Sequence, residues 1–574
     1  MPELTWIGKE KVVNHHQDVP FRMLEKQYTY GADDSENMII HGDNLEALKS
    51  LLPRYEGKIK CIYIDPPYNT GNEGWVYNDN VKDPKIRKWL GEVVGKEGED
   101  LSRHDKWLCM MYPRLKLLQK LLADDGAIFI SIDDNELYNL KAICDEIFGA
   151  SCFVSTVSWQ RTYSTRNDSK GIVSEVEHIL VYSKKPGWNP NKLPRTAEMD
   201  SIYKNPDNDV IAWASDNPFA PDSVAHQGMV YAIQHPFTGE MLYPPSRRHW
   251  TFGQEQMLDY MKEWCPYKLS NLHDEKERAE ICGISEDAVR KDVLGIVLDI
   301  PLDAAAEKAK AIYERGQWPK FYFTNGGKGG IRRKTYINSV GGKPPTNLWQ
   351  YSDVGHTDEA SKTLKAIFEG NATFDTPKPP RLIERILQIA GDKDTLILDS
   401  FAGSGTTAHA VLNMNKADGG HRKFILIEMM DYANSITAER VKRVIDGYGE
   451  GKSAVNGTGG SFSYYELGEP LLFPDGNLNE AVGVEKTREY IWYTETKAPY
   501  APQNGYYLGK HGDTGYYFYY EPDRVTILGH EFLSQISEKA GSYVIYADRC
   551  ALSDTELSDY GVLFKKIPRD ITKI

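Results

Sequence analysis

The 574-residue sequence has no long apolar segment. A membrane-spanning helix needs about 18 or more consecutive apolar residues, and the longest comparable run, residues 127–132, has the length of a strand. Residues 1–16 also lack the charged-then-apolar pattern of a secretory signal. At 41% hydrophobic residues the chain can still bury substantial cores, and its length suggests roughly three or four domains. The sequence therefore predicts a cytoplasmic protein with no membrane partner.

Cysteine is scarce and scattered. The chain has seven cysteines, and no two of them are spaced as Cys-x-x-Cys. This distribution favours a reducing compartment over a disulfide framework, and it lacks the spacing of a zinc site. We therefore predict no metal centre.

The sequence also lacks an excess of positive charge. A net charge of -14 argues against a nucleic-acid partner, since phosphate contacts need Lys and Arg. The distribution is uneven, however, because residues 325–345 hold no acid and five bases: Lys328, Arg332, Arg333, Lys334 and Lys343. A second basic stretch lies between residues 161 and 195. A basic middle within an acidic chain is compatible with a DNA groove, and a solvated charged surface is the alternative.

The most informative stretch is residues 61–69, Cys-Ile-Tyr-Ile-Asp-Pro-Pro-Tyr-Asn. Its apolar half predicts a short buried strand, and the prolines then hold the chain extended after Asp65. The Asp65 carboxylate and the Pro66 carbonyl could accept both N–H bonds of a flat molecule's amino group, while the Tyr68 ring stacks on its face. An ordinary loop opening, with Tyr68 as a core residue, is the alternative.

A second stretch, residues 399–407, reads Asp-Ser-Phe-Ala-Gly-Ser-Gly-Thr-Thr between a strand and a helix. Such a turn presents backbone N–H groups and a partial positive charge to an anion. It lacks the third glycine of the dinucleotide fingerprint and carries Phe401, so one carboxylate is a better ligand than a pyrophosphate. Glu428 ends the next strand, where an acid binds ribose hydroxyls in doubly wound sheets.

These patterns predict an α/β fold with a doubly wound, Rossmann-like parallel sheet. We expect the strands ending at Asp399, Glu428, Asp43 and Asp65 to be neighbours in that order, with all four acids on the carboxyl edge. The fold would be circularly permuted, because the nucleoside-binding half follows the other half in the chain. Asp43 would then bind the adenine amino group of the nucleoside. Residues 69–105 form a long polar stretch predicted to be a lid or binding loop.

The two motifs together resemble the β-class amino-methyltransferases of DNA, which use S-adenosylmethionine. Five further segments resemble the modification subunit of Type III restriction–modification systems: residues 42–46, 130–136, 354–357, 377–379 and 546–550. The resemblance covers both catalytic halves and the tail. It does not identify a DNA sequence that the inserted region would read.

The resemblance implies roles for individual residues. In the amine site, Asp65 and the Pro66 carbonyl would hold the exocyclic amine of a flipped adenine, and Tyr68 would stack on the adenine ring. The catalytic set would be Asp65, Pro66, Pro67 and Tyr68. The cofactor set would be Asp43, Lys378, Asp399, Phe401, Gly403, Ser404, Gly405, Thr406, Thr407 and Glu428. DNA contacts are expected from Arg247, Arg248, Lys328, Arg332, Arg333 and Lys334. In this family the aspartate form of the first motif is usual for adenine N6 and the serine form for cytosine N4.

The implied domain divisions are an N-terminal arm (1–35), a catalytic half (36–185), an inserted target-recognition domain (186–345), a cofactor half (346–446) and a C-terminal α/β domain (447–574). Helices are expected in the insert at 254–263, 287–297 and 304–315. The implied function is adenine-N6 methylation of duplex DNA by a homodimer that can bind a restriction subunit. The alternatives are a cytosine-N4 enzyme, an enzyme without a nuclease partner, an RNA or protein amide methyltransferase, and a DNA-binding scaffold with an inactive cofactor site.

Overall fold

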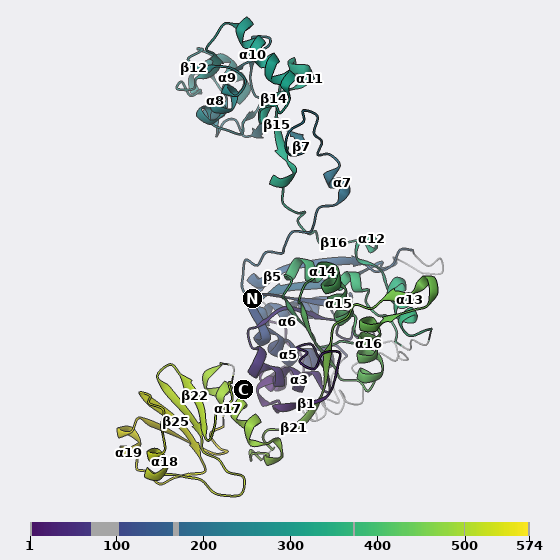
Figure 1. Cartoon of the computed structure of the whole chain (residues 1–574), viewed down its shortest axis with the longest axis vertical. Coiled ribbons are helices and arrows are strands. Elements are labelled where there is room, and N and C mark those ends of the chain that lie inside the picture. The colour runs from purple at the N-terminus through teal and green to yellow at the C-terminus, as the bar shows by residue number, and fades with distance from the viewer. Residues whose placement is uncertain are drawn as a thin grey trace. The chain divides into compact units, whose positions relative to one another are not determined.

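The computed structural model describes residues 3–70, 103–164, 172–370, 374–473, 475–498 and 500–571. The chain divides into two compact units, one formed by Met1–Asn191 with Pro345–Ile574 and the other by Lys192–Pro344 (Figure 1). The second unit begins six residues after the start expected for the insert and ends one residue before its expected end. Most of the predicted loop at 69–105 lies outside the described residues.

A ten-stranded sheet forms the centre of the first unit. Its strands run in the order β1 (Arg22–Tyr30), β21 (Phe462–Pro470), β2 (Met38–His41), β18 (Lys423–Glu428), β17 (Leu396–Asp399), β3 (Ile59–Ile64), β4 (Leu122–Ile132), β6 (Val176–Ser183), β5 (Phe153–Gln160) and β16 (Leu348–Trp349). The neighbours from β21 to β4 pair in parallel, whereas β1, β6 and β5 introduce antiparallel pairs. The sheet thus has the expected parallel centre.

The expected order of the four acid-bearing strands is wrong. The strand before Asp43 lies beyond β18, and β17 lies between β18 and β3. Because all four strands are parallel, Asp43, Glu428, Asp399 and Asp65 still follow their strands at the same edge of the sheet. The true order places the Asp399 strand directly beside the Asp65 strand, since Leu398 pairs with Ile62.

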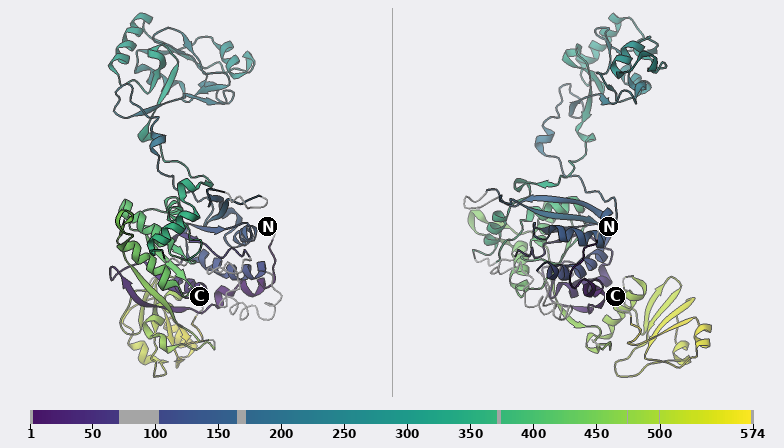
Figure 2. Two further views of the ribbon diagram at one scale, coloured as in Figure 1. Left: turned by 90° about the vertical axis from the view of Figure 1, so that its right-hand side faces the viewer. Right: turned by 180° about the vertical axis from the view of Figure 1, so that it is seen from behind.

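Helices cover both faces of this sheet (Figure 2). One layer contains α3 (Asn44–Tyr55), α5 (Arg103–Leu121) and α6 (Leu137–Phe148), and the other contains α14 (Pro380–Ala390), α15 (Thr406–Asp418) and α16 (Glu439–Asp446). In β3, Ile62 and Ile64 pack in the core with the first layer, while Cys61 and Tyr63 are buried as well. Burial on both faces explains why these strands read as continuous apolar runs.

The two ends of the chain depart from the predicted divisions. The segment 1–35, expected to be an arm, contains α1 (Lys9–Val12), α2 (His15–Asp18) and β1. β1 pairs with β21, which lies inside the segment expected to be a separate tail domain, and β21 pairs in turn with β2. The central sheet therefore extends past both predicted boundaries, because β1 at its edge and β21 beside it complete it.

Beyond β21 the chain forms a second, smaller α/β layer. Its four-stranded sheet consists of β22 (Tyr507–His511), β23 (Thr514–Phe518), β25 (Ser542–Ala547) and β27 (Val562–Lys566). Apolar clusters lie around it, with α17 (Val484–Thr496), α18 (His530–Ser534) and α19 (Asp554–Asp559). A short strand pair, β24 (Ile527–Leu528) with β26 (Arg549–Cys550), completes this part. Another short pair, β19 (Gly447–Tyr448) with β20 (Val455–Asn456), lies before β21 in the chain. Helices α12 (Tyr351–Val354) and α13 (Thr357–Ile367) lie at the start of the segment predicted as the cofactor half.

The unit Lys192–Pro344 has its own aromatic core, which includes Trp213, Tyr231, Trp250, Trp264 and Phe321. Its sheets are β10-β9-β13-β12, β14-β15-β7 and β11-β8. The strands are β7 (Trp213–Asp216), β8 (Phe219–Pro221), β9 (Ile233–Gln234), β10 (Met241–Leu242), β11 (Arg248–Trp250), β12 (Tyr267–Ser270), β13 (Gly295–Leu298), β14 (Phe321–Phe323) and β15 (Ile331–Tyr336). The helices are α7 (Ala197–Asp200), α8 (Gln254–Lys262), α9 (Glu275–Cys282), α10 (Leu302–Arg315) and α11 (Thr324–Gly327).

One helix expected in this unit, at 287–297, is wrong. Only a short 3-10 turn occurs at Glu286–Ala288, and residues from Gly295 onward form β13, which pairs with both β12 and β9. Residues predicted as the end of the helix instead belong to a half-buried strand, and periodicity alone cannot distinguish the two.

All seven cysteines are free thiols, and six of them are buried. Burial raises the pKa of the Cys61 thiol, so this side chain stays protonated at neutral pH. Across the described ranges no helix combines the length and apolar character needed to cross a membrane. In the same part of the chain no three His, Cys, Asp or Glu side chains are grouped so that they could hold a metal ion.

Candidate active site

A cavity of about 750 Å³ opens at the carboxyl edge of the central sheet, where β17 and β3 are neighbours. This is the point where the strand order reverses, and open α/β sheets bind ligands at such points. Residues from both sequence motifs line it, namely Asp65, Pro66, Tyr68, Asp399, Phe401, Gly403, Ser404, Thr406 and Thr407, and Lys378 lines it as well. Two stretches more than 300 positions apart in the sequence therefore meet in one cavity.

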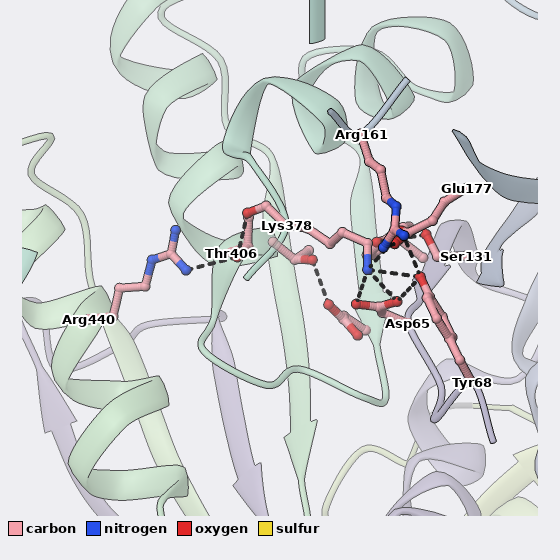
Figure 3. Close-up of polar contacts among 11 residues, drawn as sticks. Asp65, Tyr68, Ser131, Arg161, Glu177, Lys378, Thr406 and Arg440 are labelled. Atoms are coloured by element: carbon pink, nitrogen blue, oxygen red, sulfur yellow. Dashed lines mark hydrogen bonds and ion pairs between the residues drawn. The ribbon is translucent and has the colours of Figure 1, made fainter. Parts of the chain in front are cut away.

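The Asp65 carboxylate is held by two long side chains (Figure 3). The Lys378 ammonium lies 2.8 and 2.7 Å from its two oxygens, and the Tyr68 hydroxyl donates to Oδ1 at 2.9 Å. The Lys378 Nζ is also 2.9 Å from the Tyr68 hydroxyl and 5.0 Å from the centre of the Tyr68 ring. An ammonium thus occupies the place where the sequence predicts that an amino group is bound.

A second carboxylate, Glu177 on β6, belongs to the same cluster. Its Oε2 lies 3.1 Å from the Tyr68 hydroxyl and 3.6 Å from the Lys378 Nζ, while Arg161 Nη1 donates to its Oε1 at 3.0 Å. Burial raises the pKa of Asp65, and the Lys378 ammonium opposes that rise. Lys378 therefore favours the ionised, hydrogen-bond-accepting form of the carboxylate.

The loop that carries Asp65 is fixed from behind. The Trp107 indole N–H donates to the Pro67 carbonyl at 2.7 Å. Asn69, fully buried with a φ of 58°, donates through its side chain to the Arg103 carbonyl and to Glu136. Among the described residues nothing donates to the Pro66 carbonyl, which lines the cavity. The loop thus presents one free carbonyl and one carboxylate to the cavity from a rigid backbone.

The other side of the cavity is the tight turn before α15. Gly403 and Gly405 have φ values of 52° and 82°, a region that favours glycine. A β-carbon at Gly405 would lie 3.1 Å from the Thr437 carbonyl oxygen. Limited space therefore favours glycine at this position, in addition to the backbone conformation. The turn ends at Thr406, the first residue of α15, whose hydroxyl donates to the Lys378 carbonyl at 3.2 Å. Lys378 thereby touches both halves of the site.

Asp399 and Glu428 bind this turn itself. Asp399 accepts from the Phe401 N–H at 3.1 Å and from the Thr407 hydroxyl at 2.6 Å. Glu428 accepts from the backbone N–H groups of Gly403 at 2.8 Å and Met430 at 3.0 Å. Burial raises the pKa of both carboxyls, to about 7 in each case. These two acids hold the turn in shape.

Four of the expected site residues lie outside the described lining of the cavity: Asp43, Pro67, Gly405 and Glu428. Asp43 caps α3, where its Oδ1 accepts from the Leu45 N–H at 2.9 Å and the Glu46 N–H at 3.2 Å. Its other oxygen lies 3.5 Å from Arg114 Nη2. The structure thus places Asp43 at the same sheet edge but gives its carboxylate a capping function.

The residues expected to bind DNA differ in their exposure. Arg247, Arg248, Lys328 and Arg332 are exposed. Arg333 is partly buried and pairs with Asp216. Lys334 is a correction, because it is only 1% exposed and its ammonium binds Asp207 and, at 2.6 Å, Asp209. Since strand alternation points Lys334 into the core, it stabilises the unit and cannot reach a phosphate.

Sequence reasoning missed several residues of the site. Glu177 and Arg161 complete the Asp65 cluster, and Trp107 and Glu136 support its loop. Glu177 is the single acid in β6, which could have drawn attention to it. Trp107 and Arg161 carry no such signal, because their partners are identified only by the tertiary fold.

The sequence of this chain matches the family described as DNA methylase over residues 59–439, well over half of its length. The chain belongs to the DNA methylase family. The matched region contains both halves of the cavity, and it includes the inserted unit. The residues that line the cavity therefore all lie within the region that matches the family.

Similar curated proteins come from two types of restriction–modification system. The chain is 32% identical over 463 residues to the Type III restriction-modification enzyme StyLTI Mod subunit of Salmonella typhimurium LT2, covering 76% of this chain and 61% of that protein. It is 30% identical over 482 residues to the EcoPI Mod subunit of Escherichia phage P1, covering 75% and 64%. It is 29% identical over 421 residues to the Type II methyltransferase M.KpnI of Klebsiella pneumoniae, covering 71% and 84%. The chain spans less than two thirds of the length of the two Type III relatives.

Proposed function

We propose that the protein transfers a methyl group from S-adenosylmethionine to N6 of an adenine flipped out of duplex DNA, in the cytoplasm, as the modification subunit of a Type III system. One observation carries the proposal: the Asp65–Tyr68 loop and the turn at 399–407 line a single cavity. Methyl transfer needs a donor and an acceptor within bonding reach, and a shared cavity at a sheet switch point supplies that proximity.

The turn side of the cavity fits S-adenosylmethionine, which supplies a methyl group on a positively charged sulfur. Phe401 offers an apolar ring, and the glycine turn offers backbone N–H groups beside the N-terminus of α15. The residues proposed to surround the methionine part are Lys378, Phe401, Gly403, Ser404 and Thr406. Glu428 and Asp399 would act by fixing the turn, with Gly405 and Thr407, and Asp43 by capping α3 beside the nucleoside.

The Asp65 side of the cavity fits a planar amine. Asp65 and the Pro66 carbonyl would accept the two N–H bonds, which favours a pyramidal nitrogen and frees its lone pair for in-line attack. The Oδ1 atom of Asp65 accepts from both Lys378 and Tyr68, whereas Oδ2 accepts from Lys378 alone among the described residues. The amine would therefore bind Oδ2 and displace or share the Lys378 ammonium. Tyr68 would stack on the base, and Pro67 would keep the loop extended.

A base within a duplex cannot reach this cavity unless it is flipped out, which costs a few kcal/mol. We propose that the unit Lys192–Pro344 offsets this cost as the target-recognition domain. Its exposed bases Arg247, Arg248, Lys328 and Arg332 are the candidates for phosphate contacts, and Arg333 would need to exchange Asp216 for DNA. The identity to Type III Mod subunits supports a restriction subunit as a further partner. We also propose that the protein is a homodimer.

The test is mass spectrometry of nucleosides from DNA incubated with the protein and isotope-labelled S-adenosylmethionine. We expect labelled N6-methyladenine. Labelled N4-methylcytosine would replace the adenine assignment with the cytosine alternative, and label in neither nucleoside would reject the proposal. Sedimentation of the purified chain, alone and with a candidate restriction subunit, tests the two protein partners.

A further inference from the structure

Arg440, on α16, is a buried cation whose partners among the described residues are all uncharged. It is 1% exposed, and its Nη1 donates to the Ser404 hydroxyl at 2.7 Å. The same nitrogen donates to the Thr406 hydroxyl at 2.8 Å (Figure 3). Its Nη2 donates to His409 Nδ1 at 3.2 Å, and its Nε has no partner in this part of the chain. A buried charge without an opposite charge is unfavourable, so this arrangement implies an anion that is not part of the described protein.

The guanidinium keeps its charge in this environment. Burial lowers the pKa of Arg440 to about 10, which still leaves it protonated at neutral pH. Burial and the neighbouring Arg440 hold the pKa of His409 well below its usual range. His409 is therefore neutral and contributes an acceptor, with no negative charge to balance the guanidinium.

The hydroxyls bound by Arg440 extend into the cavity. Ser404 and Thr406 both line it, although Ser404 is only 2% exposed. Because each hydroxyl oxygen accepts from Arg440, each hydroxyl hydrogen must be donated elsewhere. Thr406 donates to the Lys378 carbonyl, whereas the Ser404 hydroxyl has no acceptor among the residues that the structure describes. Arg440 thus leaves the hydroxyl hydrogen of Ser404, a residue of the cavity lining, available for a ligand.

We infer that Arg440 is the positioning residue for a carboxylate bound at the turn formed by residues 403–406, and that this carboxylate is the one on the amino-acid part of S-adenosylmethionine. Arg440 supplies the opposite charge from beneath the turn and orients Ser404 Oγ–H toward the carboxylate. The N-terminus of α15 adds its partial positive charge at the same place. The inference rests on the proposed function, because the cofactor provides the anion.

Two ligands that differ in a single group isolate this effect. S-adenosylmethionine and its decarboxylated form share the adenosine, the sulfonium and the amine, and only the first has the carboxylate. We expect Arg440→Met to weaken binding of S-adenosylmethionine at least about tenfold, the size of a lost charged hydrogen bond. The same variant should leave the affinity for the decarboxylated form within about twofold. Isothermal titration calorimetry on the full chain measures both affinities without turnover.

Arg443→Met is the matched control, because Arg443 lies on the same helix and pairs with Glu439 and Glu369 at the surface. It should change neither affinity. Arg440→Lys, which keeps the charge and loses the fork that reaches both hydroxyls, should give an intermediate loss for S-adenosylmethionine. Ser404→Ala should give a smaller loss confined to the same ligand. If Arg440→Met shows no cooperative thermal unfolding, it is not folded, and the affinities of Arg440→Lys and Ser404→Ala then test the inference.

Equal losses for both ligands would show that Arg440 only supports the fold, and no loss for either would remove it from the site. Both results overturn the inference while leaving the proposed function intact. A wild-type chain that binds neither ligand would instead reject the proposed cofactor itself, and the inference with it.

Discussion

The two sides of the cavity hold their carboxylates by different means. Asp65 is bound by the ends of flexible side chains, the Lys378 ammonium and the Tyr68 hydroxyl. Asp399 and Glu428, at the ends of the next two strands, are bound by backbone N–H groups and by a hydroxyl of the turn that follows. Side-chain partners can be exchanged for a substrate at little cost to the backbone, whereas backbone partners cannot.

The comparison shows that acids at equivalent positions of one sheet edge can have unlike functions. Asp65 presents a carboxylate to an incoming group, and the other two acids build the surface against which a ligand lies. Each of the following variants changes the carboxylate that receives the incoming group or the turn against which a ligand lies.

Asp65→Ala should have the largest effect. Removing the acceptor of the amine should lower the rate of methyl transfer about a hundredfold to a thousandfold or more, with the affinity for S-adenosylmethionine nearly unchanged. Single-turnover transfer and calorimetry measure the two quantities. Asp134→Asn is the control, since this exposed acid follows the next strand and pairs, within the described ranges, with His178 alone. Full activity of Asp65→Ala would remove the carboxylate from the chemistry.

Gly405→Asp should act on the opposite side. Its β-carbon would approach the Thr437 carbonyl at a φ that disfavours other residues, and its charge would repel a bound carboxylate. We expect cofactor affinity to fall roughly tenfold to a hundredfold. Gly419→Asp is matched, because Gly419 ends the same helix at a φ of 67° with open space around it. Unchanged cofactor affinity in Gly405→Asp would show that the turn does not bind the cofactor.

Lys378→Met should alter the pH dependence of transfer. Burial raises the pKa of Asp65 and Lys378 opposes it, so losing the ammonium should raise the pKa further. Because the amine needs an ionised acceptor, the acidic limb of the rate profile should move to higher pH. The variant should therefore lose activity mainly at the acidic end of the profile and recover it at alkaline pH. A profile that keeps its shape would mean that Lys378 does not control the charge of Asp65.

Asp399→Asn should have the smallest effect, on stability. In the folded chain burial raises the pKa of Asp399 from its usual 3.8 to about 7, so the folded state binds this proton more tightly than the unfolded state. Stability from this group is therefore present below pH 4 and is lost as the pH rises toward 7. The variant should gain relative to wild type between pH 5 and 7, by at most about 1.4 kcal/mol per pH unit. Chemical denaturation at a series of pH values measures the difference, and a constant difference contradicts the prediction.

Much of this architecture is predictable from local sequence. Apolar runs that end in Asp or Glu give parallel strands with acids on one edge, and the prolines and glycines that follow give the two turns. The strand order is not predictable in the same way, because it depends on which helix layer each connection crosses. For that reason the sequence suggested an Asp43 strand beside the Asp65 strand, where β17 lies instead.

The partners of the site residues were the least predictable. Lys378 was expected near the cofactor, and its ammonium instead binds Asp65, because its backbone is held by Thr406 while its side chain crosses the cavity. Lys334 was expected to contact DNA on the strength of a basic run, yet strand alternation turns it inward to Asp207. Composition shows how many charges a segment has, and only the fold shows which of them face solvent.

We propose that one cavity receives both the methyl donor and the amine. A compound that joins S-adenosylhomocysteine to adenine through a short linker at N6 tests it directly, by its affinity for the full chain. We expect this compound to bind the wild-type chain more tightly than S-adenosylhomocysteine alone. We expect both Asp65→Ala and Gly405→Asp to bind it less tightly than the wild-type chain does. Binding no tighter than S-adenosylhomocysteine, with no response to Asp65→Ala, would contradict it.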